Sequence, residues 1–333
     1  MSQGEVEQLI SGPRAILITI SWLTLSLAFP GSAAAARVRQ LSELTPSAIV
    51  HLEKTADWVA ITADAVWVGG TSPFAVDRID PLTNRRVATV RLPGEPCSDF
   101  AVGFGSLWVP LCKPTVGLAK IDFESNQLMQ VFKIGAVQPE ASITASSDSV
   151  WMTVGKDGAL ERIDPATGVV RQTIHVPAGS YNVLYSDGRI WITNPKESQV
   201  TIIDAATGKS LGTAPAGPGA RWQAAGAGAV WILNEDGSLT RVETRNDSSK
   251  TVDLRMPKGG AYIGFGAGML WTTTMKTPLS LIDPAGMTQL CQWIGKGGDS
   301  LGVGFGAIWL TDYYAGTVAR IPVEEAVGHC KAP

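Results

Sequence analysis

The sequence predicts an all-β protein, a seven-bladed β-propeller with four-stranded antiparallel blades. A tryptophan preceded by an apolar residue recurs at spacings of 41, 43, 40, 40, 40 and 38 residues. The chain also holds 36 Gly and 20 Pro among its 333 residues, which suits many short strands joined by turns. A period near 40 residues with several strands per unit is typical of a propeller. The repeated residues are Trp67, Trp108, Trp151, Trp191, Trp231, Trp271 and Trp309.

Each repeat is expected to supply four strands, as the fourth unit illustrates. There the inner strand is predicted at 182–185, the tryptophan strand around Trp191, a third strand at 199–204 and an outer strand from Ser210 onward. A third-strand aspartate precedes a turn of the Ala-Thr-Gly kind, where its side chain can cap backbone amides, so we interpret it as structural. This aspartate is Asp80, Asp122, Asp164, Asp204 or Asp283 in five of the repeats.

The last repeat has only three strands and ends near Ile321. We expect the segment 48–53 to supply its missing outer strand, so that the beginning and end of the chain close the ring and leave no open sheet edge. The propeller is therefore predicted to cover residues 46–333, preceded by a linker at 37–45.

Residues 1–36 resemble a secretory signal peptide. Arg14 precedes an apolar run at 15–29, and small residues follow it. The run is short for a transmembrane helix, so no stable membrane span is expected after cleavage, although an uncleaved anchor is the alternative. This predicts a periplasmic or secreted protein.

Four cysteines remain after residue 36, an even number that suggests disulfides in an exported protein. The repeat register brings Cys97, at the entrance of the second blade, close to Cys112, in a loop at the same end of that blade. It leaves Cys291 on an outer strand to pair with Cys330 in the tail.

The formal net charge is −3, which gives no electrostatic footprint for nucleic acid. We expect a monomer whose partner is a small molecule, a glycan or a protein of the cell envelope.

The motifs Gly-x-Ile-Trp-Ile-Thr-Asn, at 188–194, and Ile-Asp-x-x-Thr-Gly, at 203–208, resemble two related groups of seven-bladed propellers. One is the YVTN-type surface and periplasmic propellers, and the other is the streptogramin (virginiamycin) B lyase-like propellers. The second resemblance implies metal-assisted cleavage of a cyclic depsipeptide by histidine and glutamate at the channel mouth. Here His51 and His175 are predicted on outer strands and His329 in the tail, so no lyase histidine is carried over.

The candidate binding residues come from the connections that enter the inner strands. These connections and the loops after the second strands build one end of the ring, which we call the mouth face. Nine residues before the repeated tryptophans stand polar and aromatic residues, with Arg221 and Asp299 directly before two of them. The predicted ligand-binding residues of this set are Trp58, Asp99, Asn182, Arg221, Trp222, Tyr262 and Asp299.

Four lysines occupy one position of the repeat, five residues after the tryptophan: Lys113, Lys156, Lys196 and Lys276. They are predicted to form a partial basic collar on the mouth face that attracts an anionic partner such as an acidic glycan. The alternative is that they are solvated loop lysines. Five aromatic residues could stack on sugar rings or pack as anchors of their loops: Tyr181, Trp222, Tyr262, Tyr313 and Tyr314.

No cofactor is expected, although Asp57, Asp99, Glu140 and Asp299 offer the oxygen ligands that a divalent cation such as Mg²⁺ takes. The sequence therefore favours an exported propeller that binds a ligand or protein partner on its mouth face or in its central funnel, without catalysing a reaction. The alternative is a lyase or lactonase-type hydrolase in the funnel, possible without histidine because Asp, Glu, Tyr and Arg also transfer protons.

Overall fold

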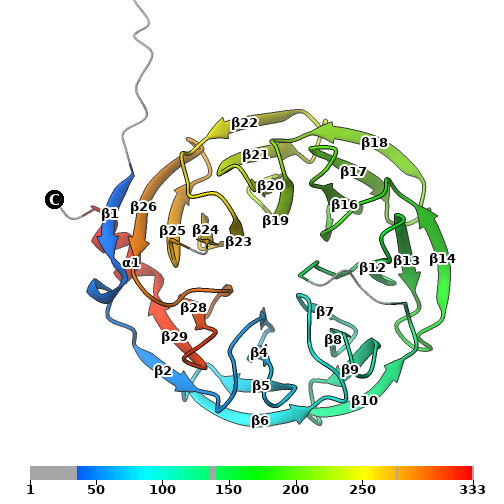
Figure 1. The fold of residues 1–333 in the computed structure, drawn as a ribbon, viewed down its shortest axis with the longest axis horizontal. Helices are drawn as coiled ribbons and strands as arrows, with labels where there is room; N and C mark the ends of the chain where they lie inside the picture. The colour runs from blue at the N-terminus through cyan, green and yellow to red at the C-terminus, as the bar shows by residue number, and fades with distance from the viewer. Residues whose placement is uncertain (1–35, 136–139, 275, 332–333) are drawn as a thin grey trace, which may run out of the picture. The chain divides into compact units, whose positions relative to one another are not determined.

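A ring of seven four-stranded antiparallel sheets surrounds a central channel (Figure 1). The computed structural model describes residues 36–135, 140–274 and 276–331. The predicted all-β, seven-bladed fold is confirmed. The expected signal peptide falls outside the described residues except for Ala36.

The blades follow one another along the chain, each running from an inner to an outer strand. Blade one holds β3 (Val59–Ile61), β4 (Val66–Gly70), β5 (Ala75–Asp80) and β6 (Arg85–Arg91). Blade two holds β7 (Ala101–Gly103), β8 (Ser106–Leu111), β9 (Gly117–Asp122) and β10 (Gln127–Phe132). Blade three holds β11 (Thr144–Ala145), β12 (Val150–Val154), β13 (Ala159–Ile163) and β14 (Val170–His175). Blade four holds β15 (Val183–Ser186), β16 (Arg189–Asn194), β17 (Gln199–Asp204) and β18 (Ser210–Pro215).

The remaining blades use both ends of the chain. Blade five holds β19 (Ala220–Gly226), β20 (Ala229–Asn234), β21 (Ser238–Glu243) and β22 (Ser249–Asp253). Blade six holds β23 (Gly260–Gly266), β24 (Met269–Thr274), β25 (Leu279–Asp283) and β26 (Thr288–Ile294). Blade seven holds β27 (Leu301–Gly304), β28 (Ala307–Asp312), β29 (Thr317–Pro322) and β2 (Ala48–His51).

The pairing of β2 with β29 closes the ring, as the sequence predicts (Figure 1). Ala48 lies opposite Arg320 and His51 opposite Thr317. Val50 and Leu52 are buried in the core around blades one and seven. The N-terminal strand therefore supplies packing as well as hydrogen bonds.

The stretch 37–45, expected as a linker, contains strand β1 (Arg37–Gln40) and the 3₁₀-helix η1 (Leu41–Glu43). Strand β1 runs parallel to β26 and gives blade six a fifth strand. The tail forms helix α1 (Val323–Lys331). Both segments cover the outside of blade six, which would otherwise present an open edge.

The repeated tryptophan is buried in every blade and makes the same kind of hydrogen bond there. Its ring is completely buried, with 0% exposure. Its indole N–H donates to an oxygen of the residue five positions earlier, at the start of the inner hairpin. An aliphatic side chain could fill the core but could not make this bond, which explains the choice of tryptophan.

The third-strand aspartates cap their turns, as predicted. Oδ1 of Asp164, for example, accepts the backbone N–H groups of Ala166 and Thr167 at 2.8 Å. Similar bonds to turn amides are made by Asp80, Asp122, Asp204 and Asp283.

Two disulfides lock the fold. Cys97 is bonded to Cys112 and Cys291 to Cys330, with Cα–Cα distances of 5.8 Å and 5.7 Å. Both pairings agree with those expected from the repeat register. The second disulfide fixes α1 to the outer strand of blade six.

Candidate functional site

The mouth face collects residues from every blade because all inner strands begin there. Each inner strand runs away from this face and the second strand returns to it, as the antiparallel pairing of β19 with β20 illustrates. The residues nine positions before the repeated tryptophans therefore lie at one level of the channel, and the loops after the second strands lie around them.

Aromatic side chains meet across the channel at this level. The rings of Trp58, from blade one, and Trp222, from blade five, have centroids 6.2 Å apart. Tyr262 of blade six and Tyr181 of blade four each lie 6.3 Å from Trp222. These blades are not all neighbours, so the contacts bridge the ring. We call the four residues the aromatic floor.

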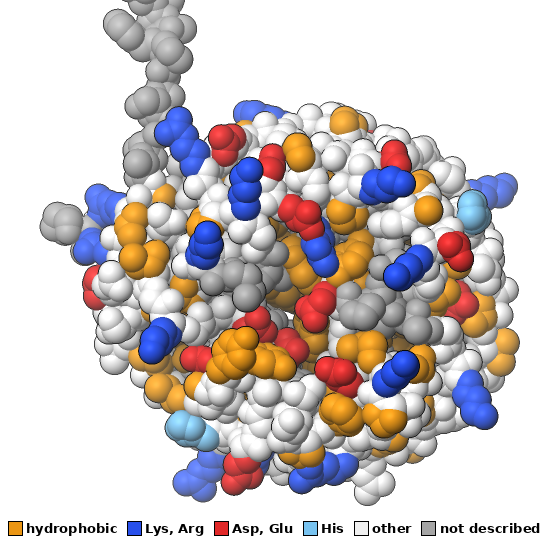
Figure 2. All heavy atoms as spheres, viewed as in Figure 1, with side chains coloured by type: hydrophobic (Ala, Val, Ile, Leu, Met, Phe, Trp, Pro, Cys, Tyr) orange, Lys and Arg blue, Asp and Glu red, His pale blue; other side chains and the backbone are white. Residues whose placement is uncertain are grey.

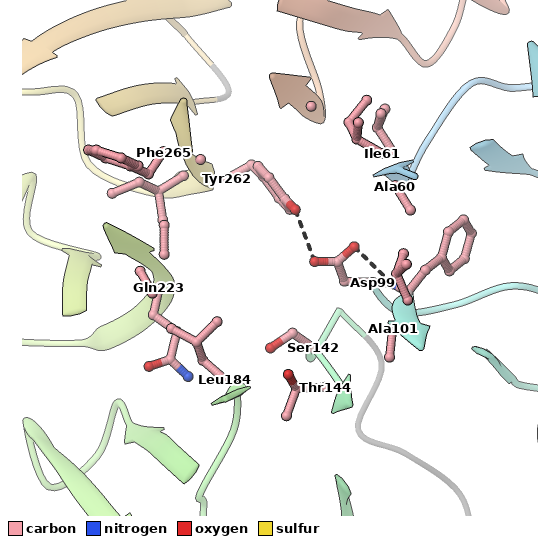
Figure 3. A pocket seen from close by; sticks show the side chains of 18 of the residues that line it. Ala60, Ile61, Asp99, Ala101, Ser142, Thr144, Leu184, Gln223, Tyr262 and Phe265 are labelled. Carbon is pink, nitrogen blue, oxygen red and sulfur yellow. Dashed lines mark hydrogen bonds between the residues drawn. The ribbon is translucent and has the colours of Figure 1, made fainter. Parts of the chain in front are cut away.

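A hydrogen bond from blade six to blade two extends the aromatic floor. The Tyr262 hydroxyl donates to Oδ2 of Asp99 at 3.0 Å, and Oδ1 of Asp99 accepts the N–H of Phe100 at 2.8 Å (Figure 3). Burial raises the pKa of Asp99 to about 6, although both hydrogen bonds favour the ionised form. Asp99 therefore releases its proton less readily than an exposed aspartate does.

Arg221 lies over the aromatic floor. Its guanidinium carbon is 4.4 Å from the centroid of Tyr181 and 5.7 Å from that of Trp222. Its Nη2 donates to the Tyr181 hydroxyl at 2.7 Å, and its Nη1 donates to Oε1 of Glu235 at 2.7 Å. Arg221 and Glu235 therefore neutralise each other while holding Tyr181 in place.

Asp57 and Asp299 form a pair of interacting carboxyl groups between blades one and seven. Burial, the charges of Asp299 and Glu140, and the hydrogen bond with Asp299 raise the pKa of Asp57 to about 9. Burial also raises the pKa values of Asp299 and Glu140. Two carboxyls in one site cannot both ionise easily, so at neutral pH the pair shares a proton.

The four collar lysines, Lys113, Lys156, Lys196 and Lys276, are all exposed. They lie in the loops that follow β8, β12, β16 and β24, which end at the mouth face. On the face seen in Figure 2, acidic side chains gather around the central depression, and most Lys and Arg side chains lie farther out. The site thus combines an acidic and aromatic centre with a basic periphery.

The remaining predicted site residue, Asn182, is only 1% exposed. Its Oδ1 accepts the N–H of Ser142 at 2.6 Å, and its Nδ2 donates to the carbonyl of Arg221 at 2.8 Å. Asn182 therefore joins blades three, four and five beneath the surface.

No group of three or more His, Cys, Asp or Glu side chains suited to a metal ion occurs among residues 36–135, 140–274 and 276–331. His51 and His175 lie on the outer strands β2 and β14, and His329 lies in α1 beside Glu325. These positions agree with the expectation that no histidine reaches the channel.

A cavity of about 340 Å³ lies in the channel beneath the aromatic floor (Figure 3). All seven inner strands line it. Asp99, Ser142, Thr144, Gln223 and Tyr262 contribute polar groups to its lining, and about half of its surface is apolar. Successive blades run counterclockwise in Figure 1 and clockwise in Figure 3. Figure 3 therefore shows the channel from the end opposite to the one that faces the viewer in Figures 1 and 2.

The sequence analysis did not identify Glu235 or the contacts between aromatic rings across the channel. Glu235 follows Trp231 by four residues, next to the position of the collar lysines, and this register could have identified it. The contact of Trp58 with Trp222 has no such signal, because it joins two blades that are distant in the sequence.

The chain matches no known protein family, and no curated protein resembles it in sequence. Solved structures share its fold. A structure titled streptogramin B lyase aligns over 82% of this chain and 96% of its own, with a TM-score of 0.69 and 16% identity. BamB from Moraxella catarrhalis aligns over 84% and 98%, with a TM-score of 0.60 and 13% identity. U3-55K aligns over 84% and 100%, with a TM-score of 0.68 and 11% identity.

The first two of these proteins are seven-bladed propellers, so the expected resemblance to lyase-like propellers is confirmed at the level of the fold. Such low identities carry no information about activity. Among the residues that the structure describes, no helix has the length and apolarity needed to cross a membrane.

Proposed function

We propose that this chain is an exported binding propeller that holds an acidic glycan on its mouth face and catalyses no reaction. The observation that carries the proposal is the aromatic floor, which closes the channel mouth with side chains from blades one, four, five and six. Trp58, Trp222 and Tyr181 are themselves buried, with exposures of 3%, 6% and 8%. A partner would therefore rest on the polar and charged side chains around the floor.

The charges around the aromatic floor fit a sugar with acidic substituents. Because Asp57 and Asp299 share a proton and Arg221 is paired with Glu235, the centre repels an anion less than its number of carboxylates suggests. Carboxylates accept hydrogen bonds from the hydroxyl groups of a sugar. The collar lysines would then attract the acidic groups.

Tyr313 and Tyr314 add an aromatic platform beside this surface. They follow β28, in a loop at the mouth face, and their rings form a T-shaped pair with centroids 5.2 Å apart. Tyr314 is 92% exposed, so its ring is accessible for stacking on a sugar.

Export is supported by the two disulfides, because structural disulfides persist in oxidising compartments. We propose cleavage of residues 1–36 and release of a monomer to the periplasm or the medium. Mass spectrometry of the protein recovered from these fractions would give the mature N-terminus. An N-terminus at residue 1 in a membrane fraction would contradict cleavage and favour an anchor.

A thermal-shift panel tests the ligand class. The probes are oligogalacturonate, a neutral oligosaccharide of equal length, a lactone, a cyclic depsipeptide, Mg²⁺ and EDTA. Stabilisation by oligogalacturonate alone is the expected result. Equal stabilisation by the neutral oligosaccharide would remove the role of the collar. If no probe stabilises the protein, the glycan proposal is contradicted. The partner would then be a small molecule that the panel does not contain, or a protein.

A second candidate function, a lyase or lactonase-type hydrolase, is favoured by one observation. Asp57 keeps its proton at neutral pH beside the carboxyl of Asp299, as a general acid paired with a base requires. Turnover of the lactone or the depsipeptide that is lost in Asp57→Asn would establish this function. Asp253→Asn, which removes an exposed carboxylate on β22, is the matched control.

A further inference from the structure

The channel cavity beneath the aromatic floor contains a carboxylate that no basic residue balances. Among the described residues that line it, Asp99 is the only charged one. None of the ion pairs formed by the described part of the chain includes Asp99. Its two hydrogen bonds come from neutral donors, Phe100 N–H and the Tyr262 hydroxyl. A buried carboxylate without a cation is costly, so the site favours a positive charge from outside the chain.

Apolar groups form about half of the cavity surface, and polar groups form the other half. The side chains that provide the apolar surface come from six inner strands: Ile61, Val102, Ala145, Leu184, Ala225 and Phe265. A ligand held by Asp99 would contact these side chains along the channel. An apolar part of such a ligand would pack against them.

Aromatic rings accompany the carboxylate. Phe100 and Tyr262 line the cavity beside Asp99, and Phe265 follows Tyr262 by three residues along β23. Aromatic faces attract ammonium groups, and this attraction strengthens when the cation leaves water.

A metal ion does not fit this arrangement. Mg²⁺ and Ca²⁺ require six or more oxygen ligands, of which several are usually carboxylates. The cavity offers one carboxylate, and no metal-binding cluster occurs among the described residues. A single carboxylate with aromatic neighbours is instead sufficient for an organic cation.

We propose that this cavity is a second binding site, which takes a small organic ammonium ion with an apolar body through the channel end opposite the mouth face. The ammonium group binds Asp99 and the body packs against the apolar side chains of the channel. A volume of about 340 Å³ suits a ligand of roughly the size of benzylamine or phenethylamine. Because the aromatic floor separates this site from the mouth face, it does not depend on the glycan proposal.

Three probes of one shape test the proposal: benzylamine, benzyl alcohol and benzoate, titrated at neutral pH and followed by ligand-observed NMR. Benzylamine should bind at least about tenfold more tightly than the other two. Equal affinity for all three probes, or no binding of benzylamine, would overturn the proposal.

Two substitutions and one control locate the bound amine. Asp99→Asn keeps the shape and removes the charge, and it should weaken benzylamine binding by about 30-fold or more. Ala225→Leu fills the channel and keeps Asp99, and it should abolish binding. Asp253→Asn makes the same charge change on the outer strand β22 and should bind like the wild type. Thermal unfolding of each variant confirms that it is folded.

Wild-type affinity in Asp99→Asn would show that the carboxylate does not hold the amine. Wild-type affinity in Ala225→Leu would show that the amine binds elsewhere. Either result contradicts the proposal, whatever the glycan panel gives.

Discussion

The hydroxyl of Tyr262 donates a hydrogen bond to Oδ2 of Asp99 at 3.0 Å, and this bond joins blade six to blade two across the channel. It belongs both to the aromatic floor, seen from the mouth face, and to the end wall of the channel cavity. Side chains at the entrances of non-adjacent inner strands can thus separate two surfaces of one propeller.

Replacing Tyr262 by Phe should lower the free energy of unfolding by about 1–3 kcal/mol, because the ring stays and only a hydrogen bond to a charged acceptor is lost. The pKa of Asp99 should rise further, since this bond favours its ionised form. Urea unfolding measures the first effect and NMR titration of the carboxyl the second. Tyr314→Phe, at a fully solvated ring, is the matched control, and an equal loss in both variants would refute the role of the bond.

The shifted pKa of Asp57 predicts that stability falls as the pH rises. Its pKa is about 9 in the folded protein against an ordinary aspartate value of 3.8, so the folded state binds this proton more tightly. The resulting stabilisation is complete below about pH 4 and is lost as the pH approaches 9. Between pH 5 and pH 9 the unfolding free energy of the wild type should drop by at least about 1.4 kcal/mol more than that of Asp57→Asn. Parallel pH profiles would contradict the shared proton.

Removing the ring of Trp191 should destabilise the protein by about 3–5 kcal/mol, because Trp191 is completely buried in blade four. Trp191→Phe keeps much of the packing and loses the bond from Nε1 to the Ser186 carbonyl at 3.2 Å, so its loss should be smaller. Thermal and urea unfolding distinguish the two. An unchanged melting temperature in Trp191→Ala would refute the core role of the repeated tryptophan.

Deleting residues 46–53 should open the ring, because β2 supplies the outer strand of blade seven and buries Val50 and Leu52. The exposed edge of β29 should promote association. Size-exclusion chromatography with light scattering should show oligomers or aggregates. A monomer as stable as the intact chain would mean that closure is dispensable.

Replacing Cys97 and Cys112 by Ser should cost about 3 kcal/mol, because the disulfide closes a loop of 15 residues. The matched double replacement at Cys291 and Cys330 opens a loop of 39 residues and should cost slightly more. Denaturant unfolding of the two variants under identical conditions compares these losses. No loss in either variant would contradict a structural role.

The sequence was sufficient to predict the fold because each blade repeats the same local pattern of residues. Trp191 and its six equivalents mark the second strands, and Asp164 and its equivalents mark the turns after the third. Strand β1 carried no such mark. Its pairing with β26 depends on the open edge of blade six, which only the assembled ring defines.

The sequence predicted which residues of the candidate site lie at one level of the channel, but not which of them contact each other. The repeat register identifies Trp58, Asp99, Trp222 and Tyr262 as residues of one layer, because each stands nine positions before a tryptophan. It does not indicate that Trp58 meets Trp222 or that Tyr262 meets Asp99, since these pairs depend on the diameter of the ring and the reach of each side chain.

The most direct test of the central claim compares two sets of four lysines in calorimetric titrations with oligogalacturonate. One variant replaces the collar residues Lys113, Lys156, Lys196 and Lys276 by Gln. The other makes the same charge change at the exposed residues Lys133, Lys209, Lys250 and Lys331, which lie outside the collar. The account predicts that the collar variant weakens binding by about tenfold or more while the second variant binds like the wild type. Equal weakening in both, or a loss confined to the second, would contradict a glycan site on the mouth face.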